Sequence, residues 1–149
     1  MKLSTRSRYG LKALVDLAVC YGDGHVSLPY LAAQQGISEA YLEQLLRSLR
    51  QGGIIETMRG AQGGYTLSCA PENISVQDAL RILEGSTALA DCVGIELHDC
   101  DNACACAARP LLLKLQMHID DVLRNTTIQD LAENNIQQKR RLDHAKSLS

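Results

Sequence analysis

The fold is decided by the stretch GISEAYLEQLLRSLR, residues 36–50. Gly36 favours a tight turn, and Ser38 is the type of residue that caps the start of a helix. After Ser38, apolar residues recur three and four positions apart, which is the spacing of one helix face. The apolar positions are Tyr41, Leu42, Leu45, Leu46 and Leu49. The stretch therefore predicts a sharp turn followed by a helix, through about residue 50, with one buried face.

The flanking residues extend this unit on both sides. Apolar spacing and capping residues predict helices over about 4–21 and 28–35, with Pro29 in the first turn of the second. Beyond Gly52 and Gly53, residues 54–57 and 65–68 are typical of strands, and residues 59–64 form a glycine-rich hairpin tip. Three short helices and a two-stranded hairpin predict a winged helix-turn-helix, in a chain that is mainly α with a small β-wing.

The second half of the chain predicts further helices. Ser75 precedes a helix over 76–83, and a longer helix covers 110–124. In the longer helix, apolar residues step by three, four and three positions, which is typical of a seam between two paired helices and predicts a homodimer. The seam consists of Leu112, Leu115, Ile119 and Val122.

These elements predict four parts in the chain. They are a winged helix-turn-helix domain (1–84), a cysteine-containing loop (85–108), a dimerisation helix with a short C-terminal helix over 128–133 (109–136) and a flexible polar tail (137–149).

Composition and charge limit the class of protein. The 149 residues suit one compact domain with an arm. No run of eighteen apolar residues and no secretory apolar core are present, so we expect no membrane partner and a cytoplasmic location. The net charge is only −2, but residues 1–67 carry seven Lys/Arg against five Asp/Glu, whereas residues 68–108 carry one Arg against seven acids. DNA binding requires a basic face and not a basic protein, and the first part provides it.

The helix over residues 39–50 suits the major groove of DNA. Glu43 can accept from a cytosine amino group, and Gln44 can bond an adenine edge. Arg59 at the hairpin tip suits a narrow minor groove, and the amides that follow Ser38 suit a phosphate oxygen. The candidate contacts with double-stranded DNA are Ser38, Ala40, Tyr41, Glu43, Gln44, Arg47, Arg59 and Gln62.

Other classes of function have less support in the sequence. Three helices and a hairpin also suit a protein-interaction module. The sequence contains no catalytic triad, phosphate-binding loop or acid pair, so we do not expect an enzyme.

Four of the six cysteines lie within fifteen residues, in the pattern Cys92-x7-Cys100-x3-Cys104-x-Cys106. Disulfides rarely persist in a reducing cytosol, which favours metal binding or thiol chemistry. Iron–sulfur clusters take four ligands, most often Cys, and zinc is also held by four thiolates. The spacing lacks the paired Cys-x2-Cys motifs common in zinc modules, which favours a cluster. Zinc and a thiol redox switch stay as alternatives.

Seven motifs carry a family resemblance over nearly the full length of the chain. They are Met1-Lys2-Leu3-Ser4, Arg8-Tyr9, Gly36-Ile37-Ser38, Tyr41-Leu42-Glu43-Gln44-Leu45, Arg59-Gly60, Gly63-Gly64-Tyr65 and Thr127-Ile128-Gln129-Asp130-Leu131. Together they resemble the bacterial iron–sulfur cluster regulators typified by IscR. The resemblance implies a dimeric winged-helix transcription factor in which Glu43, Gln44 and Arg59 contact DNA. It also implies cluster-dependent control of DNA binding, by a 2Fe–2S or, alternatively, a 4Fe–4S cluster.

The resemblance also bears on the cluster ligands. The family has three cysteines, the last two separated by five residues as Cys100 and Cys106 are; Cys92 matches the first, although seven residues rather than five follow it. Some members add a His where this chain has Arg109, and others add a carboxylate where it has Arg8; neither Arg can ligate. We therefore expect the metal ligands Cys92, Cys100, Cys104 and Cys106, with His98 as the alternative to Cys104. Relatives without a cluster regulate cysteine metabolism and others sense nitric oxide, so a thiol-responsive or nitric-oxide-responsive regulator is the alternative function.

Overall fold

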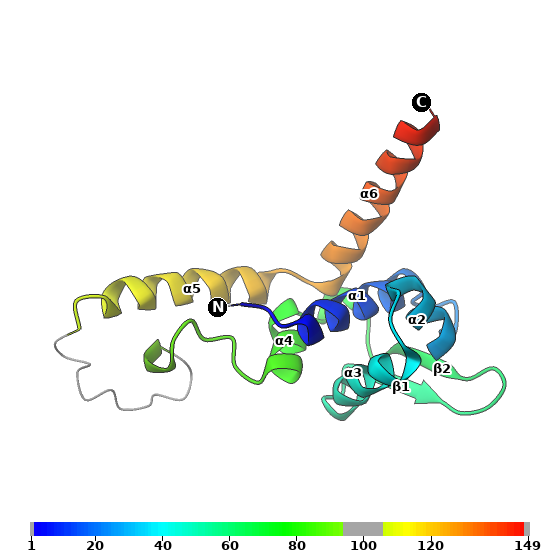
Figure 1. Ribbon diagram of the computed structural model, residues 1–149, viewed down its shortest axis with the longest axis horizontal. Coiled ribbons are helices and arrows are strands. Elements are labelled where there is room, and N and C mark those ends of the chain that lie inside the picture. The colour runs from blue at the N-terminus through cyan, green and yellow to red at the C-terminus, as the bar shows by residue number, and fades with distance from the viewer. Residues whose placement is uncertain (1, 94–105, 148–149) are drawn as a thin grey trace.

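A computed structural model describes residues 2–93 and 106–147 of the chain (Figure 1). The elements in chain order are α1 (Thr5–Val19), α2 (Leu28–Gln35), α3 (Glu39–Gln51), β1 (Ile55–Met58), β2 (Gly64–Leu67), η1 (Pro71–Asn73), α4 (Val76–Glu84), η2 (Asp91–Val93), α5 (Arg109–Asn125) and α6 (Ile128–Ser147). The mainly helical fold with a small β-wing is confirmed. None of the helices in these two ranges combines the length and the apolar character needed to cross a bilayer.

Serine caps set where four of the helices begin. The side chains of Ser4, Ser27, Ser38 and Ser75 each accept from the backbone N–H three residues later. A cap of this kind satisfies one of the amides that the first helical turn leaves unpaired. At the other end of α2, Gly36 has φ 65°, a left-handed conformation that glycine adopts without a steric penalty. The helix-turn-helix is therefore fixed by local interactions.

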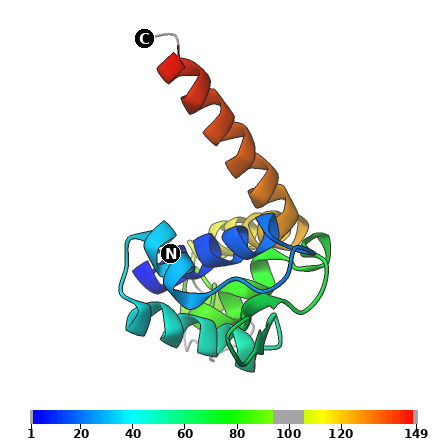
Figure 2. The same cartoon turned by 90° about the vertical axis from the view of Figure 1, so that its right-hand side faces the viewer.

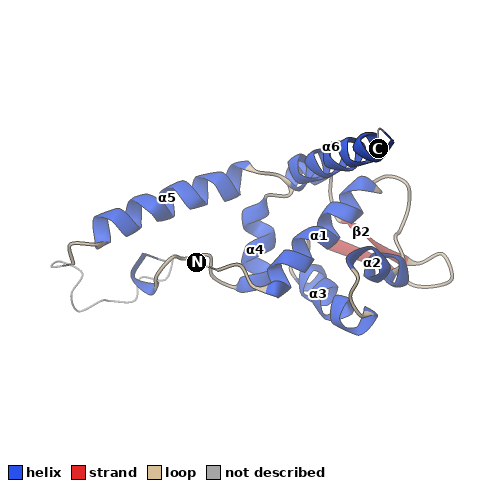
Figure 3. Cartoon of the chain, turned by 45° about the horizontal axis from the view of Figure 1, so that its top comes forward, coloured by secondary structure: helices blue, strands red, loops and turns tan. Residues whose placement is uncertain are grey.

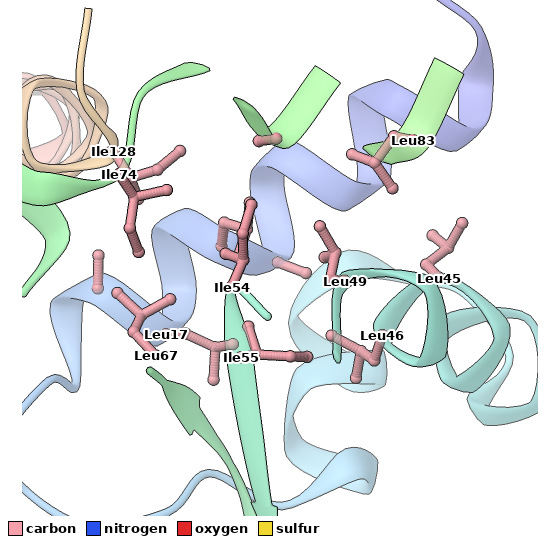
Figure 4. Close-up of a cluster of buried hydrophobic side chains, with 14 of the residues drawn as sticks. Leu17, Leu45, Leu46, Leu49, Ile54, Ile55, Leu67, Ile74, Leu83 and Ile128 are labelled. Carbon is pink, nitrogen blue, oxygen red and sulfur yellow. The ribbon is translucent and has the colours of Figure 1, made fainter. Parts of the chain in front are cut away.

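The hydrophobic core surrounds α1, which packs against α2, α3, α4, α6 and β2. Leu14 and Leu17 of α1 are fully buried among aliphatic side chains from the other elements. Figure 4 shows part of this cluster, in which α3, both strands, α4 and α6 direct apolar side chains toward one another. Because α1 packs against α2, α3 and β2 on one hand and against α4 and α6 on the other, it connects the DNA-reading part of the chain to the rest.

The wing is an antiparallel hairpin that is anchored at its base. Ile55 pairs with Leu67 and Met58 pairs with Gly64, which leaves residues 59–63 as the connecting loop. Val26, in the loop before α2, exchanges two 2.8 Å backbone hydrogen bonds with Tyr65 of β2. This third segment fixes the hairpin to the helix-turn-helix.

The last two helices leave the core in different directions (Figures 1 and 2). Helix α5 packs against α4 and η2, whereas α6 packs against α1 and extends on the side of α1 opposite to α3. Two backbone hydrogen bonds hold their junction to the start of α4: Val76 N–H donates to Thr126 at 2.8 Å, and Ile128 N–H donates to Ile74 at 2.9 Å.

The structure corrects one expectation about the C-terminus. The final helix does not end at residue 133, and residues 137–147, which we expected to form a flexible tail, continue α6. The stretch is rich in Gln, Lys and Arg and contains neither Gly nor Pro. These residues favour a helix, and no strong helix breaker interrupts α6 before Ser147.

Candidate nucleic-acid interface and cysteine segment

Helix α3 divides into a buried and an exposed face, as the sequence predicted. Its core face is fully covered and consists of Leu42, Leu45, Leu46 and Leu49. Its opposite face is exposed and carries most of the candidate contacts, namely Ala40, Glu43, Gln44 and Arg47. The helix also begins with exposed residues, Glu39 and Ala40, so its polar side and its N-terminal end are accessible to solvent. Figure 1 shows α3 at the lower edge of the molecule.

Glu43 and Arg47 form an ion pair one turn apart on this exposed face. The carboxylate oxygen of Glu43 lies 3.6 Å from an Arg47 guanidinium nitrogen, and both side chains are more than half exposed. An exposed pair of this type contributes only about 0.3–0.5 kcal/mol. Either side chain can therefore exchange its partner for a base or a phosphate at small cost.

Tyr41 connects the start of α3 to α1. Its ring packs edge-on against the ring of Tyr9, with 6.2 Å between centroids and an interplanar angle of 89°. The ammonium of Lys12 lies 5.3 Å from the centroid of the Tyr9 ring. Tyr41 is half-buried, and the Tyr9 ring that it contacts also carries the exposed cation Lys12 of α1. The sequence did not indicate this contact, because Tyr9 and Tyr41 are far apart along the chain.

Ser38 and the wing residues complete the candidate interface. The Ser38 hydroxyl accepts from Tyr41 N–H at 3.2 Å, so it acts as a helix cap in this structure. Arg59 and Gln62 are exposed in the loop at the tip of the wing. Burial raises the pKa of the Tyr65 hydroxyl, and the charges of Glu43 and of two arginines on α3 also act on it. The Tyr65 hydroxyl is therefore within electrostatic range of charged side chains on α3.

The structure describes two of the four candidate metal ligands. Cys92 lies in η2 and is half-buried, and Cys106 is exposed three residues before α5 begins; both are free thiols. Cys100, Cys104 and His98 lie outside the described residues. Within the described ranges, no group of three or more His, Cys, Asp or Glu side chains is arranged to hold a metal. The donors that are described, two thiols, have the chemistry that an iron–sulfur cluster or zinc requires.

Arg109 occupies the first position of α5. Its Nε atom is buried and has no hydrogen-bond partner among the residues that the structure describes. A guanidinium has no acceptor atom, so Arg109 is not a metal ligand. The ligand set of four cysteines stays a prediction.

Helix α5 exposes an apolar stripe. Leu111, Leu115 and Val122 follow one another at helical spacing on one side of α5 and are 60%, 43% and 63% exposed. Leu112 and Ile119, the other members of the predicted seam, are half-buried. The contacts of α5 with α4 and η2 account for this difference between the two sides of the predicted seam.

Comparison with known proteins supports a regulator. Residues 3–134 match the model of the Rrf2 family, described as an iron-dependent transcriptional regulator. The chain is 38% identical to the HTH-type transcriptional regulator CymR of Bacillus subtilis, over 89% of this chain and 90% of CymR. It is 34% identical to the HTH-type transcriptional regulator IscR of Erwinia tasmaniensis, over 90% of this chain and 80% of IscR.

Solved structures agree with the sequence comparison. The structure of CymR, described as the global cysteine regulator of B. subtilis, has a TM-score of 0.77 at 37% identity and covers 90% of this chain and 98% of that one. The structure of T. potens IscR has a TM-score of 0.72 at 37% identity, and the match covers 91% of this chain and 88% of that one. These relatives are transcriptional regulators and not enzymes.

Proposed function

The chain belongs to the Rrf2 family of transcriptional regulators, and from this membership we propose a homodimeric repressor or activator whose DNA binding is controlled by an iron–sulfur cluster. The observation that carries the proposal is the combination of an exposed polar face on α3 with cysteines next to α5. We assign DNA binding to residues 1–84, cluster binding to 85–108 and dimerisation to α5. Its action on DNA implies that it works in the cytoplasm.

In this proposal α3 enters the major groove. Glu43 and Gln44 face base edges, and Arg47 contacts the backbone or a base once it leaves Glu43. Arg59 and Gln62 at the wing tip contact the adjacent minor groove. Ser38, Ala40 and Tyr41 form the first turn of α3, whose free amides face a phosphate. All of these side chains except the half-buried Tyr41 are exposed, which supports the assignment.

The apolar stripe of α5 is the proposed dimer contact. An isolated helix that exposes Leu111, Leu115 and Val122 leaves apolar area in water, and pairing with a second copy removes it. Figure 3 shows that α5 extends away from the winged domain, which leaves it accessible to a partner. Two paired chains would place two α3 helices on successive major grooves, roughly 34 Å apart.

Cys92 and Cys106, together with Cys100 and Cys104, are the proposed ligands of the cluster, which supplies a redox-sensitive and iron-dependent group when bound. Thiolate ligands in this segment change its charge and restrict its conformation. Such a change alters DNA affinity only if the protein with the cluster and the protein without it bind DNA differently. The cysteine segment must therefore be connected mechanically to α5 and the winged domains. The contact between η2 and α5 supports such a connection.

The proposal is tested on protein purified without oxygen. We expect bound iron and sulfide, an absorption and paramagnetic-resonance spectrum of a cluster, and an operator affinity that changes by about 5-fold or more on iron removal. Cys104→Ala should lower the iron content, whereas His98→Ala should not. Colourless protein with stoichiometric zinc, or an affinity that ignores iron, would refute cluster control.

A second candidate is a thiol switch without a cluster. The similarity to CymR, a cysteine regulator, favours this candidate. It predicts that iron-free protein changes its operator affinity when it is oxidised with diamide and recovers with a reductant. Iron-free protein that does not respond to diamide would exclude it.

A further inference from the structure

Helix α5 buries a glutamine while it exposes large apolar neighbours. Gln116 is 7% exposed, whereas Leu115 and Met117 on either side are 43% and 66% exposed. A buried amide is costly unless its donors and acceptor are hydrogen-bonded. The position of Gln116 therefore requires specific partners.

Both ends of the Gln116 side chain have such partners. The backbone N–H of Leu89 donates to Oε1 at 2.8 Å, and Nε2 donates to the Asp120 carboxylate at 2.9 Å. The two partners need opposite ends of the amide, because an N–H requires an acceptor and a carboxylate requires a donor. The side chain is thus fixed in one orientation between the loop after α4 and one turn of α5.

Leu89 belongs to the segment that carries Cys92. After Gly85 this segment runs without regular structure to η2, whose Val93 is buried and donates its N–H to Ala90 at 3.1 Å. Cys92 lies between these two anchors, the bond to Gln116 at Leu89 and the buried Val93. Figure 3 shows η2 alongside the N-terminal half of α5, and the two elements are in contact.

We propose that Gln116 is a positioning residue that fixes the Cys92 segment to α5 and transmits the state of the cysteines to that helix. The inference rests on the proposed function for its signal, the state of the cysteines. Its structural part, the attachment of Leu89 and Cys92 to α5, rests on the hydrogen bond from Leu89 to Gln116, which Asp120 orients, and on the contact between η2 and α5. Without the acceptor for Leu89 N–H, the segment would be freed from α5, although the Cys92 thiol itself would be unchanged.

The structural part is tested on the full iron-free chain. Gln116→Leu keeps the side-chain size and removes the acceptor, so hydrogen exchange at the Leu89 amide should accelerate roughly tenfold, the factor expected for one lost hydrogen bond. Alkylation of Cys92 should also become faster, whereas alkylation of the exposed Cys69 should not change. Gln137→Leu, at an exposed position of α6, is the matched control. If Gln116→Leu does not fold, Gln116→Asn, whose shorter amide cannot reach Leu89, replaces it.

A double variant distinguishes this role from general packing. Gln116→Glu with Asp120→Asn keeps an acceptor for Leu89 N–H. It also reverses the hydrogen bond between positions 116 and 120, because the amide at 120 now donates to the carboxylate at 116. We expect it to restore the protection of Leu89 and the slow alkylation of Cys92, whereas Gln116→Glu alone places two carboxylates together and should not. Normal protection of Leu89 in Gln116→Leu, or failure of the double variant to restore it, would overturn the attachment.

The coupling is tested by operator affinity with and without iron. We expect the ratio of the two affinities to fall toward one in Gln116→Leu, with the iron content and the dimer retained. If the ratio of the two affinities is unchanged although the Leu89 amide exchanges faster, the coupling is overturned but the attachment is upheld. A wild-type protein whose affinity ignores iron would instead refute the proposed function, and hydrogen exchange would still decide the attachment.

Discussion

Gly64 lies directly against the backbone of Val26: a Cβ atom built on Gly64 would lie 2.6 Å from the Val26 carbonyl carbon. The neighbouring Tyr65 exchanges both of its backbone hydrogen bonds with Val26. The base of the wing thus touches the loop before α2 so closely that only glycine fits. This contact between Gly64 and Val26 fixes the position of the wing relative to α3.

Gly64→Ala should therefore displace the wing. Because the added methyl meets backbone and not a flexible side chain, we expect a loss of about 1–3 kcal/mol in the free energy of unfolding, measured by denaturant titration. Ala61→Ser at the exposed wing tip is the control and should change stability by less than about 0.5 kcal/mol. If Gly64→Ala leaves the free energy of unfolding unchanged, the Val26 contact does not constrain the wing.

Arg59→Ala tests the wing as a DNA contact. We expect operator affinity to fall by about 1–3 kcal/mol and the slope of log K against log salt to become shallower, because one cation no longer displaces counterions. The measurement is a fluorescence-anisotropy titration over a salt series. Arg140→Ala is the control, because Arg140 belongs to α6, which extends on the side of α1 opposite to α3; it should leave both quantities unchanged. Equal effects of the two variants would contradict the assignment.

Lys12 is predicted to contact a phosphate. Its ammonium is exposed and lies over the ring of Tyr9, which packs against Tyr41 of α3. We therefore expect Lys12→Gln to reduce the salt slope by about 1 and to weaken binding to operator and to non-specific DNA to a similar degree. Lys12→Arg should retain the slope, and Lys114→Gln on α5 should have no effect. Tyr9→Leu keeps the charge and removes the ring, so its affinity should fall although Lys12 is present. A full slope in Lys12→Gln would show that the cation does not reach DNA.

The exposed stripe of α5 gives a prediction about assembly. Leu115→Glu places a charge in the proposed dimer contact and should weaken the dimer by about 3 kcal/mol or more, roughly a hundredfold, in sedimentation equilibrium. Met117→Glu is the matched control, because Met117 is exposed on another side of the same helix. Dissociation by Met117→Glu but not by Leu115→Glu would move the contact to that other side.

Glu84 gives a prediction about pH. Hydrogen bonding from the side chain and backbone of Ser4, whose N–H donates to the carboxylate at 2.7 Å, lowers the pKa of Glu84. Since the pKa is lowered in the folded state, the stabilisation is present above the unfolded value of about 4.3 and is lost as the pH falls through the folded value. We expect the free energy of unfolding of wild type to exceed that of Glu84→Gln by at most about 1 kcal/mol at pH 6, and this difference to shrink as the pH falls below the unfolded value and Glu84 becomes protonated in the folded protein. A difference that is independent of pH would show that the charge of Glu84 is not involved.

Local interactions explain why much of the winged domain was predictable. The serine caps, the left-handed turn at Gly36 and the apolar spacing of α3 each act within a few residues, and the helix-turn-helix appears where they predict it. The exposed positions of α3 follow from the same spacing. The end of α6 does not follow from polarity, because a polar, charged stretch is also typical of a tail; its high helix propensity is what extends the helix to Ser147.

The amino-acid sequence by itself determined the helices, the wing and the set of cysteines, because capping, periodicity and residue chemistry are properties of neighbouring positions. Tertiary structure alone decided that Tyr41 meets Tyr9, that Gln116 is buried against Leu89, and that Leu115 is exposed while Ile119 is half-covered. The physical reason is that burial and pairing depend on which distant segment arrives beside a residue. No repeat or cap within α5 specifies that η2 and α4 cover one side of it and leave the other in water.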